Sequence, residues 1–420
     1  MVEKYKRTLK ACYIGFIAQA AVVNLAPILF IVFWERFSLS FEELGRLVVV
    51  NFASQIAVDI WAVRFADRFR LRHLAATAHG AAFLGLALLG ILPSVLPSPY
   101  LGLVIASVIY AVGGGLLEVL LSPIVSALPS EGKSSQMSLL HSFYCWGQVG
   151  VCLLSTLYIE FFGKDHWFIL PFVWALIPLF NFFVFLRVPL PEIRLTDEGK
   201  GGLRSFFTSR FFLCAMLLMI AAGASEQVIS QWSSLFAERG LGMPKFWGDL
   251  LGPVAFAAMM GVGRLLFGIF GKRISLKRAL LFCGFLATAS YLLIALVKVP
   301  VISLMGCMLC GFAVSLMWPG VISLSAEKYP AGGCAMFGLL AVMGDIGCSL
   351  GPWLAGLVSD KAAGSDRLLS LLPFAGLTAE QAAIKLGILA AIVFPLLMLF
   401  GVLYIGRTRK KSGKKRTENH

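Results

Sequence analysis

The chain has 420 residues, of which 59% are hydrophobic and 14% are charged. Soluble domains contain roughly 45–50% apolar and about 25% charged residues, so this composition excludes an ordinary soluble protein and indicates one whose solvent is largely lipid. The formal net charge of +14 raises the alternative of a nucleic-acid-binding protein, which the distribution of the basic residues, described below, argues against.

Long hydrophobic windows follow one another along the whole chain. The first six cover 8–34, 43–66, 73–93, 99–128, 137–163 and 166–187, and the other six cover 209–238, 245–270, 279–298, 300–327, 333–359 and 384–406. A helix needs about 20 apolar residues to cross a bilayer, and these windows are too continuous for the alternating strands of a barrel. We therefore predict an all-α membrane protein of twelve transmembrane helices.

The longest hydrophilic segment between the windows lies at the centre of the chain, which suggests two related halves. We predict two pseudo-symmetric six-helix bundles with a linker and a tail: an N-terminal half over 1–187, a cytoplasmic linker over 188–208, a C-terminal half over 209–406 and a basic cytoplasmic tail over 407–420.

Most of the 36 lysines and arginines fall in the segments that lie on the same side of the membrane as the N-terminus. Such an excess marks the cytoplasmic side, so we expect both termini in the cytoplasm and the protein in the cell (inner) membrane, of bacterial type. The tail RTRKKSGKKR is expected to lie against anionic lipid headgroups rather than to bind nucleic acid.

Corresponding loops of the two halves carry a weak internal repeat. The loop after the second window contains Asp67 and Arg68, and Lys272 and Arg273 stand at the equivalent positions after the eighth. We expect these four residues to form a cytoplasmic gate. Pairing with the ends of neighbouring helices would stabilise one access state, and the residues would exchange partners in the other state.

Three sequence segments resemble a known family. The loop with Asp67 and Arg68 resembles the signature loop of the major facilitator superfamily. Gly114, Glu118 and Pro123 in the fourth window are similar to the G-x-x-x-E-x-x-x-N-P pattern of its fucose permease branch, and the run from Ser138 to Gly147 is similar to that branch's fifth helix.

The resemblance implies a proton-coupled sugar symporter that works by alternating access. It implies that Glu118 takes part in protonation and in sugar binding, that His141 and Tyr144 contact the solute, and that Asn24 belongs to the same site. Two positions depart from the branch: Pro27 stands in place of an aspartate, and Ser122 in place of an asparagine.

The residues point to a central polar site without the resemblance. An ionisable group at membrane depth costs about 3 kcal/mol or more, so Glu118, Glu226 and Asp345 are expected to face the protein interior, and we predict that they couple transport to protons. The predicted substrate-binding residues are Asn24, Glu118, His141, Tyr144, Gln148, Glu226, Gln227, Trp318 and Asp345. The alternative for each is a hydrogen bond or packing contact between helices.

The predicted function is secondary active transport of a small polar solute, a sugar or related metabolite, by proton-coupled symport. A proton-coupled efflux carrier for drugs or metabolites is the alternative within transport, and a non-transporting receptor or enzyme the alternative of another class. We expect no catalytic residue, no metal and no cofactor, and we expect the proton gradient to be the energy source. The expected partners are the solute, protons and the lipid bilayer, and the expected oligomeric state is a monomer.

Overall fold

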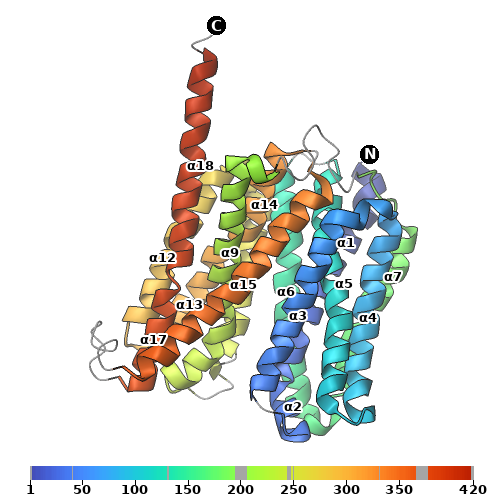
Figure 1. Cartoon of the computed structure of the whole chain (residues 1–420), viewed down its shortest axis with the longest axis vertical. Helices are drawn as coiled ribbons and strands as arrows, with labels where there is room; N and C mark the ends of the chain where they lie inside the picture. Colours follow the sequence, from blue (N-terminus) through green and yellow to red (C-terminus); the bar gives the residue numbers. More distant parts are fainter. Residues whose placement is uncertain are drawn as a thin grey trace. The chain divides into compact units, whose positions relative to one another are not determined.

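The computed structural model describes residues 2–39, 41–129, 132–193, 206–243, 247–248, 250–330, 332–365 and 377–417. These residues are almost entirely helical and include no strand (Figure 1). The chain divides into two compact units, the first comprising Met1–Gly202 and Tyr329–Val342, and the second comprising Leu203–Lys328 and Met343–His420.

The first unit contains seven helices of more than one turn among its described residues up to 193. They are α1 (Val2–Ile28), α2 (Phe30–Phe37), α3 (Phe41–Phe65), α4 (Leu71–Val95), α5 (Pro99–Ala127), α6 (Lys133–Phe162) and α7 (Ile169–Arg187). Two short 3₁₀ turns, η1 (Ala66–Arg68) and η2 (Lys164–His166), follow α3 and α6.

The second unit contains α9 (Arg210–Leu235), α11 (Ala255–Phe270), α12 (Leu276–Leu296), α13 (Pro300–Val314), α14 (Met317–Lys328), the part of α15 (Gly333–Ala363) from Met343 onward, α17 (Ala379–Ala390) and α18 (Val393–Thr417). The π-helical turn η3 (Phe236–Gly240) follows α9, and a second π-helical turn, η4 (Leu250–Val254), leads into α11. The 3₁₀ turn η5 (Gly271–Arg273) follows α11.

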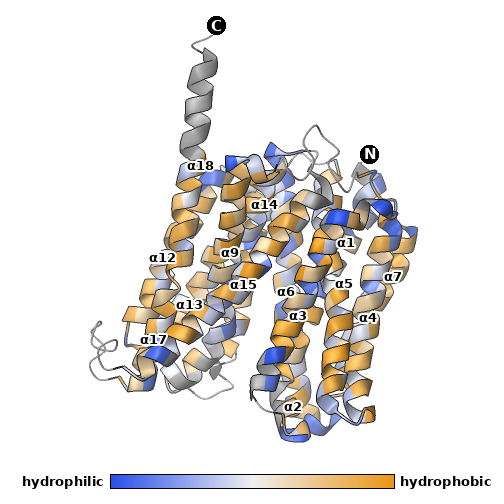
Figure 2. Ribbon diagram, in the orientation of Figure 1, coloured by the Kyte–Doolittle hydropathy of each residue, from blue (hydrophilic) through white to orange (hydrophobic). Residues whose placement is uncertain are grey.

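Among the described residues, 11 helical segments are long and apolar enough to cross a membrane. The second predicted window is occupied by α3, which has 25 residues. Helices such as α4 and α12 are mainly hydrophobic along their length (Figure 2). The prediction of an all-α membrane protein with twelve spans is confirmed. The half boundaries stay predictions, and most of the linker 188–208 lies outside the described residues.

Several helix starts follow from the local sequence. Pro99 begins α5, where its missing N–H has no intrahelical partner to lose, and the Ser98 hydroxyl accepts a 3.3 Å hydrogen bond from the Leu101 amide. At α17 the Thr378 hydroxyl accepts from the Gln381 amide at 3.2 Å, and the Gln381 side chain accepts from the Thr378 amide at 3.0 Å. This capping box satisfies two amides at the helix start.

Prolines lie close to interruptions inside two spans. The first span breaks at Leu29, two residues after Pro27, and continues as α2. The tenth breaks between α13 and α14 at Ser315 and Leu316, ahead of Pro319. Because proline has no N–H, the carbonyl four residues earlier loses its helical donor. For Pro319 that carbonyl belongs to Ser315, which matters for the site described below.

Small residues allow close helix packing in the first unit. A Cβ added to Gly113 on α5 would lie 2.5 Å from the Ala82 backbone nitrogen and 2.7 Å from the Ala78 carbonyl oxygen of α4. Both distances are shorter than a real Cβ contact, so only glycine permits this approach. Close backbone contact of this kind is how membrane helices associate without a hydrophobic driving force.

Candidate functional site

A set of polar side chains joins three helices inside the first unit. We call it the N-terminal polar cluster, and its members are Gln19 and Asn24 on α1, Glu118 and Ser122 on α5, and His141 and Tyr144 on α6. The α1–α5 link is a 2.8 Å hydrogen bond from the Gln19 amide nitrogen to the Glu118 carboxyl oxygen Oε2. The carboxyl group of Glu118 is thus fixed in direction by a neutral donor.

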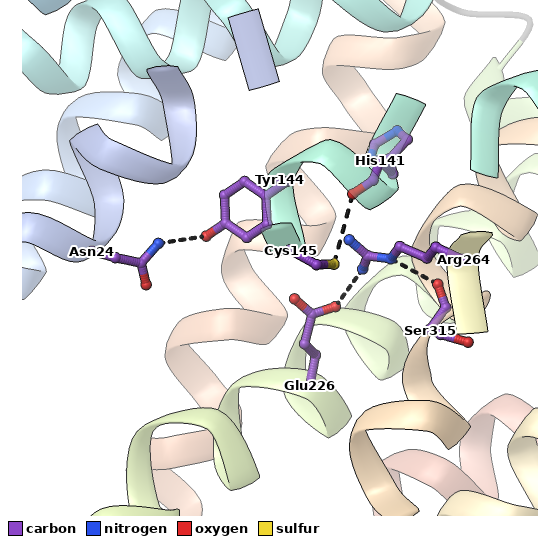
Figure 3. Close-up of polar contacts among 7 residues, drawn as sticks. All are labelled: Asn24, His141, Tyr144, Cys145, Glu226, Arg264 and Ser315. Atoms are coloured by element: carbon purple, nitrogen blue, oxygen red, sulfur yellow. Dashed lines mark hydrogen bonds and ion pairs between the residues drawn. The ribbon is translucent and has the colours of Figure 1, made fainter. Parts of the chain in front are cut away.

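The other two pairs of helices are joined in the same way. The Asn24 amide donates to the Tyr144 hydroxyl at 3.4 Å and to the Ala20 carbonyl at 2.8 Å, which links α1 to α6 (Figure 3). The Ser122 hydroxyl and His141 Nε2 lie 3.3 Å apart, which links α5 to α6. Each pair of helices is therefore joined by hydrogen bonding within the cluster.

Burial within the cluster is uneven. Gln19, Ser122 and His141 are buried, at 4%, 2% and 5% exposure, and the Phe16 ring meets the His141 ring edge-on at 4.7 Å. Asn24, Glu118 and Tyr144 are half-buried. The buried Gln19 therefore orients the half-buried Glu118, while Asn24 and Tyr144 bond to each other. The three half-buried side chains are an amide, a carboxyl group and a phenol, which are groups that can bind hydroxyls of a polar solute.

The second unit contains a separate arrangement, the C-terminal ion-pair cluster of Glu226 on α9, Arg264 on α11 and Ser315 between α13 and α14. Arg264 Nη2 lies 3.0 Å from Glu226 Oε2, and the exposed fractions of the two side chains are 3% and 11%. Arg264 Nε donates to the Ser315 carbonyl at 2.9 Å. Both contacts are drawn in Figure 3.

The backbone explains why Ser315 receives the arginine. Its carbonyl stands four residues before Pro319 and so has no helical amide from that position. A guanidinium donor takes the place of the missing amide, and the same side chain reaches Glu226. The proline interruption and the buried arginine are thus parts of one structure.

The remaining predicted binding residues lie in three further places. Gln148 is buried on α6, one turn beyond Tyr144. The Gln227 side chain accepts a 3.3 Å hydrogen bond from Gln231 on its own helix. The Trp318 ring lies against Gly344, where an added Cβ would overlap it, and the neighbouring Asp345 is 3% exposed. The Trp318 ring therefore packs against α15 at Gly344, the residue before Asp345 in the chain. The binding roles of all four residues stay predictions.

The predicted gate is described in part. Arg68 is exposed and its guanidinium lies 5.0 Å from the centre of the Phe65 ring, and Arg273 is exposed in η5. The side chains of Asp67 and Lys272 lie outside the described ones. The gate stays a prediction.

Sequence reasoning left Arg264 out of the site, although an arginine inside an apolar span is itself a signal of function. Gln19 was similarly left out of the predicted binding residues. Lys385, a lysine inside the last hydrophobic window, is 1% exposed. Its ammonium donates to the carbonyls of Ile294 at 2.9 Å and Val297 at 2.7 Å, where it caps the C-terminal end of α12.

Comparisons with known proteins agree with this architecture. The family model of the major facilitator superfamily matches residues 11–352. The E. coli fucose:proton symporter FucP is similar in structure, with a TM-score of 0.76 and 17% identity over 96% of this chain and 99% of that chain. The proton:xylose symporter XylE gives a TM-score of 0.78 with 12% identity over 96% of each chain. No curated protein matches the sequence.

The helical fold, its apolar spans and the polar groups buried within them define a multi-pass membrane transporter. The chain belongs to the major facilitator superfamily.

Proposed function

We propose that this transporter carries a small polar solute, a sugar or a related metabolite, by proton-coupled symport driven by the proton gradient. The observation that supports the proposal most is the N-terminal polar cluster, in which Glu118, His141, Tyr144 and Asn24 occur together on three helices. The structural neighbours named for fucose and xylose transport support the choice of solute class.

Glu118 is the proposed proton-coupling group of this cluster. Its partner Gln19 is uncharged, and a protonated carboxyl group still accepts a hydrogen bond through its carbonyl oxygen. The Gln19 bond can therefore persist while the proton is gained and lost. A carboxyl group beside the solute hydroxyls would bind them differently in its two protonation states, which links solute binding to proton binding.

Replacing Glu118 by glutamine tests the proposal. In proteoliposomes with an inward proton gradient, the wild type is expected to accumulate labelled solute, with fucose and xylose as the first probes. Glu118→Gln is expected to lose accumulation but to keep counterflow exchange, because the amide retains the shape and polarity of the carboxyl group without taking a proton.

Glu160→Gln is the matched control. Glu160 is an exposed glutamate near the end of α6 in the same unit, so its replacement is expected to leave both activities unchanged. Full accumulation by Glu118→Gln would reject Glu118 as the coupling group. Accumulation under an outward gradient alone would favour the efflux alternative.

A further inference from the structure

Asp59 on α3 is a buried carboxyl group outside the N-terminal polar cluster. Its exposed fraction is 0%, and it stands near the end of α3, which closes at Phe65. A carboxyl group inside an apolar span costs about 3 kcal/mol or more. Helix packing alone is therefore a weak reason for an aspartate at this position.

The packing of α5 shows which residues of its neighbours lie level with one another. A Cβ added to Gly114 would lie 3.0 Å from the Val22 side chain of α1 and 3.3 Å from Gln55 Oε1 of α3. Gly114 therefore lies in the groove between these two helices. Glu118 stands one turn further along α5 on the same face.

The same step can be taken along both neighbouring helices. On α1, which crosses the membrane in the opposite direction to α5, it leads from Val22 back to Gln19, and Gln19 does bond to Glu118, at 2.8 Å. Helix α3 packs on α5 (Figure 1) and crosses in the same direction, because one helix separates them in the chain. On α3 the step leads from Gln55 to Asp59. Gln19, Glu118 and Asp59 thus occupy one level of the unit.

The two carboxyl groups at this level have different surroundings. Glu118 is half-buried, whereas Asp59 is sealed within the unit. A solute can therefore meet the Glu118 carboxyl group, but it cannot reach Asp59 in this structure. The face of α3 that carries Asp59 is polar over two further turns, where the Gln55 side chain donates to Asn51 Oδ1 at 3.1 Å.

We propose that Asp59 is a second proton carrier, which receives the proton from Glu118 and releases it toward the side of the membrane where α3 ends. The O–H bond of Glu118 breaks as an O–H bond forms on the Asp59 carboxylate, and Glu118 returns to its anionic form. Asp59 then gives the proton to water on that side. The inference deepens the proposed function and rests on Glu118 as its coupling group.

Transfer between two carboxyl groups is favourable for an apolar span. One carboxylate gains a proton as the other group becomes a carboxylate, so the number of charges in the span does not change. No additional charge has to be brought out of water, which is the costly event at this depth. The transfer also separates the two tasks, because Glu118 meets the solute and Asp59 handles the proton alone.

The elements packed against α3 are α5, α2 and η1. Their titratable and charged residues are Tyr100, Tyr110 and Glu118 on α5, Glu35 and Arg36 on α2, and Asp67 and Arg68 in η1. The Tyr110 hydroxyl lies 2.9 Å from the Ser107 hydroxyl, and the Arg68 guanidinium lies 5.0 Å from the centre of the Phe65 ring. Of these groups, Glu118 is the carboxyl group that the helix register places level with Asp59.

Replacing Asp59 by asparagine tests the proposal. In proteoliposomes with an inward proton gradient, Asp59→Asn is expected to lower the rate of net uptake of labelled L-fucose or D-xylose by about a hundredfold, the low end of what a positioned proton-transfer group contributes. Counterflow exchange is expected to keep its wild-type rate, because in exchange the proton can enter and leave with the solute on Glu118.

Sugar binding to purified full-length protein separates the two carboxyl groups. Asp59→Asn is expected to bind with wild-type affinity and wild-type pH dependence, because Glu118 still gains and loses its proton. Glu118→Gln is expected to lose that pH dependence. A purely structural role of Asp59 would instead lower stability and impair binding and counterflow together with net uptake.

Two further variants complete the experiment. Asp59→Glu keeps a carboxyl group, so it is expected to take up sugar at least about tenfold faster than Asp59→Asn, with a shifted pH profile because the group is displaced by one methylene. Asp165→Asn is the matched control, since the Asp165 side chain is 91% exposed in the same unit, and it is expected to behave like the wild type.

The outcomes decide the inference separately from the proposed function. Wild-type net uptake by Asp59→Asn, or loss of counterflow and sugar binding by folded Asp59→Asn, overturns the role of Asp59 and leaves symport through Glu118 standing. If Asp59→Asn does not fold, a pH profile of Asp59→Glu identical to that of the wild type overturns it. A wild type that accumulates neither sugar under the gradient overturns the proposed function and this inference with it.

Discussion

His141 shows most clearly what a single residue contributes to the first unit. It is buried, and its imidazole lies 3.3 Å from the Ser122 hydroxyl and packs edge-on against Phe16. It therefore links α5 to α6, and its contact with the solute stays a prediction. A histidine with packing as its sole role would affect stability and leave solute affinity unchanged.

Replacing His141 by alanine separates these two roles. We expect solute affinity to fall by about 1–3 kcal/mol, because a polar group of the bound solute loses its partner. Binding is measured on purified protein at one temperature, well below the onset of unfolding. His73→Ala, at an exposed position near the start of α4, is the control. An unchanged affinity in His141→Ala would remove this residue from the site.

Individual site residues could be predicted from the sequence where a charged side chain stands inside an apolar run. Glu118, Glu226 and Asp345 stand out because carboxylates are rare in apolar spans. Their partners were not predictable in the same way. The Gln19–Glu118 contact joins residues 99 positions apart and the Glu226–Arg264 contact joins residues 38 apart, and such pairs depend on how the helices pack, which local sequence does not encode.

At the scale of helices, glycine and proline determine how the elements meet. Pro319 interrupts the tenth span and leaves the Ser315 carbonyl to Arg264. Gly347 on α15 lies against the α9 backbone, where an added Cβ would overlap the Ile220 carbonyl oxygen. The helix that carries Glu226 is therefore positioned by close backbone contact as well as by its polar side chains.

Gly347→Ala tests this packing. We expect a loss of stability of about 1–3 kcal/mol, as for other overpacked interiors, because two backbones must separate to admit one methyl group. The measurement is the thermal unfolding of purified protein in detergent. Gly364→Ala is the control, since a Cβ there has nothing within 4 Å. An unfolding temperature equal to that of the wild type would show that α9 and α15 tolerate separation.

The helices themselves were predictable to a large extent, for a physical reason. Crossing lipid requires a continuous apolar run in which all backbone hydrogen bonds are internal, so hydropathy alone located the spans. The breaks inside them followed less directly. The interruption ahead of Pro319 was not predicted, and the π-helical turns η3 and η4 had no recognised signal in the sequence.

At the scale of the whole molecule, the sequence, the fold and the comparisons agree on a major facilitator transporter. The two units carry different polar chemistry. The first has a hydrogen-bonded cluster around Glu118, and the second has a buried ion pair between Glu226 and Arg264. Sequence analysis predicted polar residues in both units, but it did not predict that the second would hold a buried ion pair.

The central claim is that solute and proton cross the membrane together. Proteoliposomes that contain the wild-type protein and a trapped pH indicator, with no initial pH gradient, test it most directly. Adding solute outside is expected to acidify the lumen at a rate that follows uptake of the labelled solute, and Glu118→Gln is expected to abolish the acidification. Entry of solute with no accompanying change of internal pH would contradict the account.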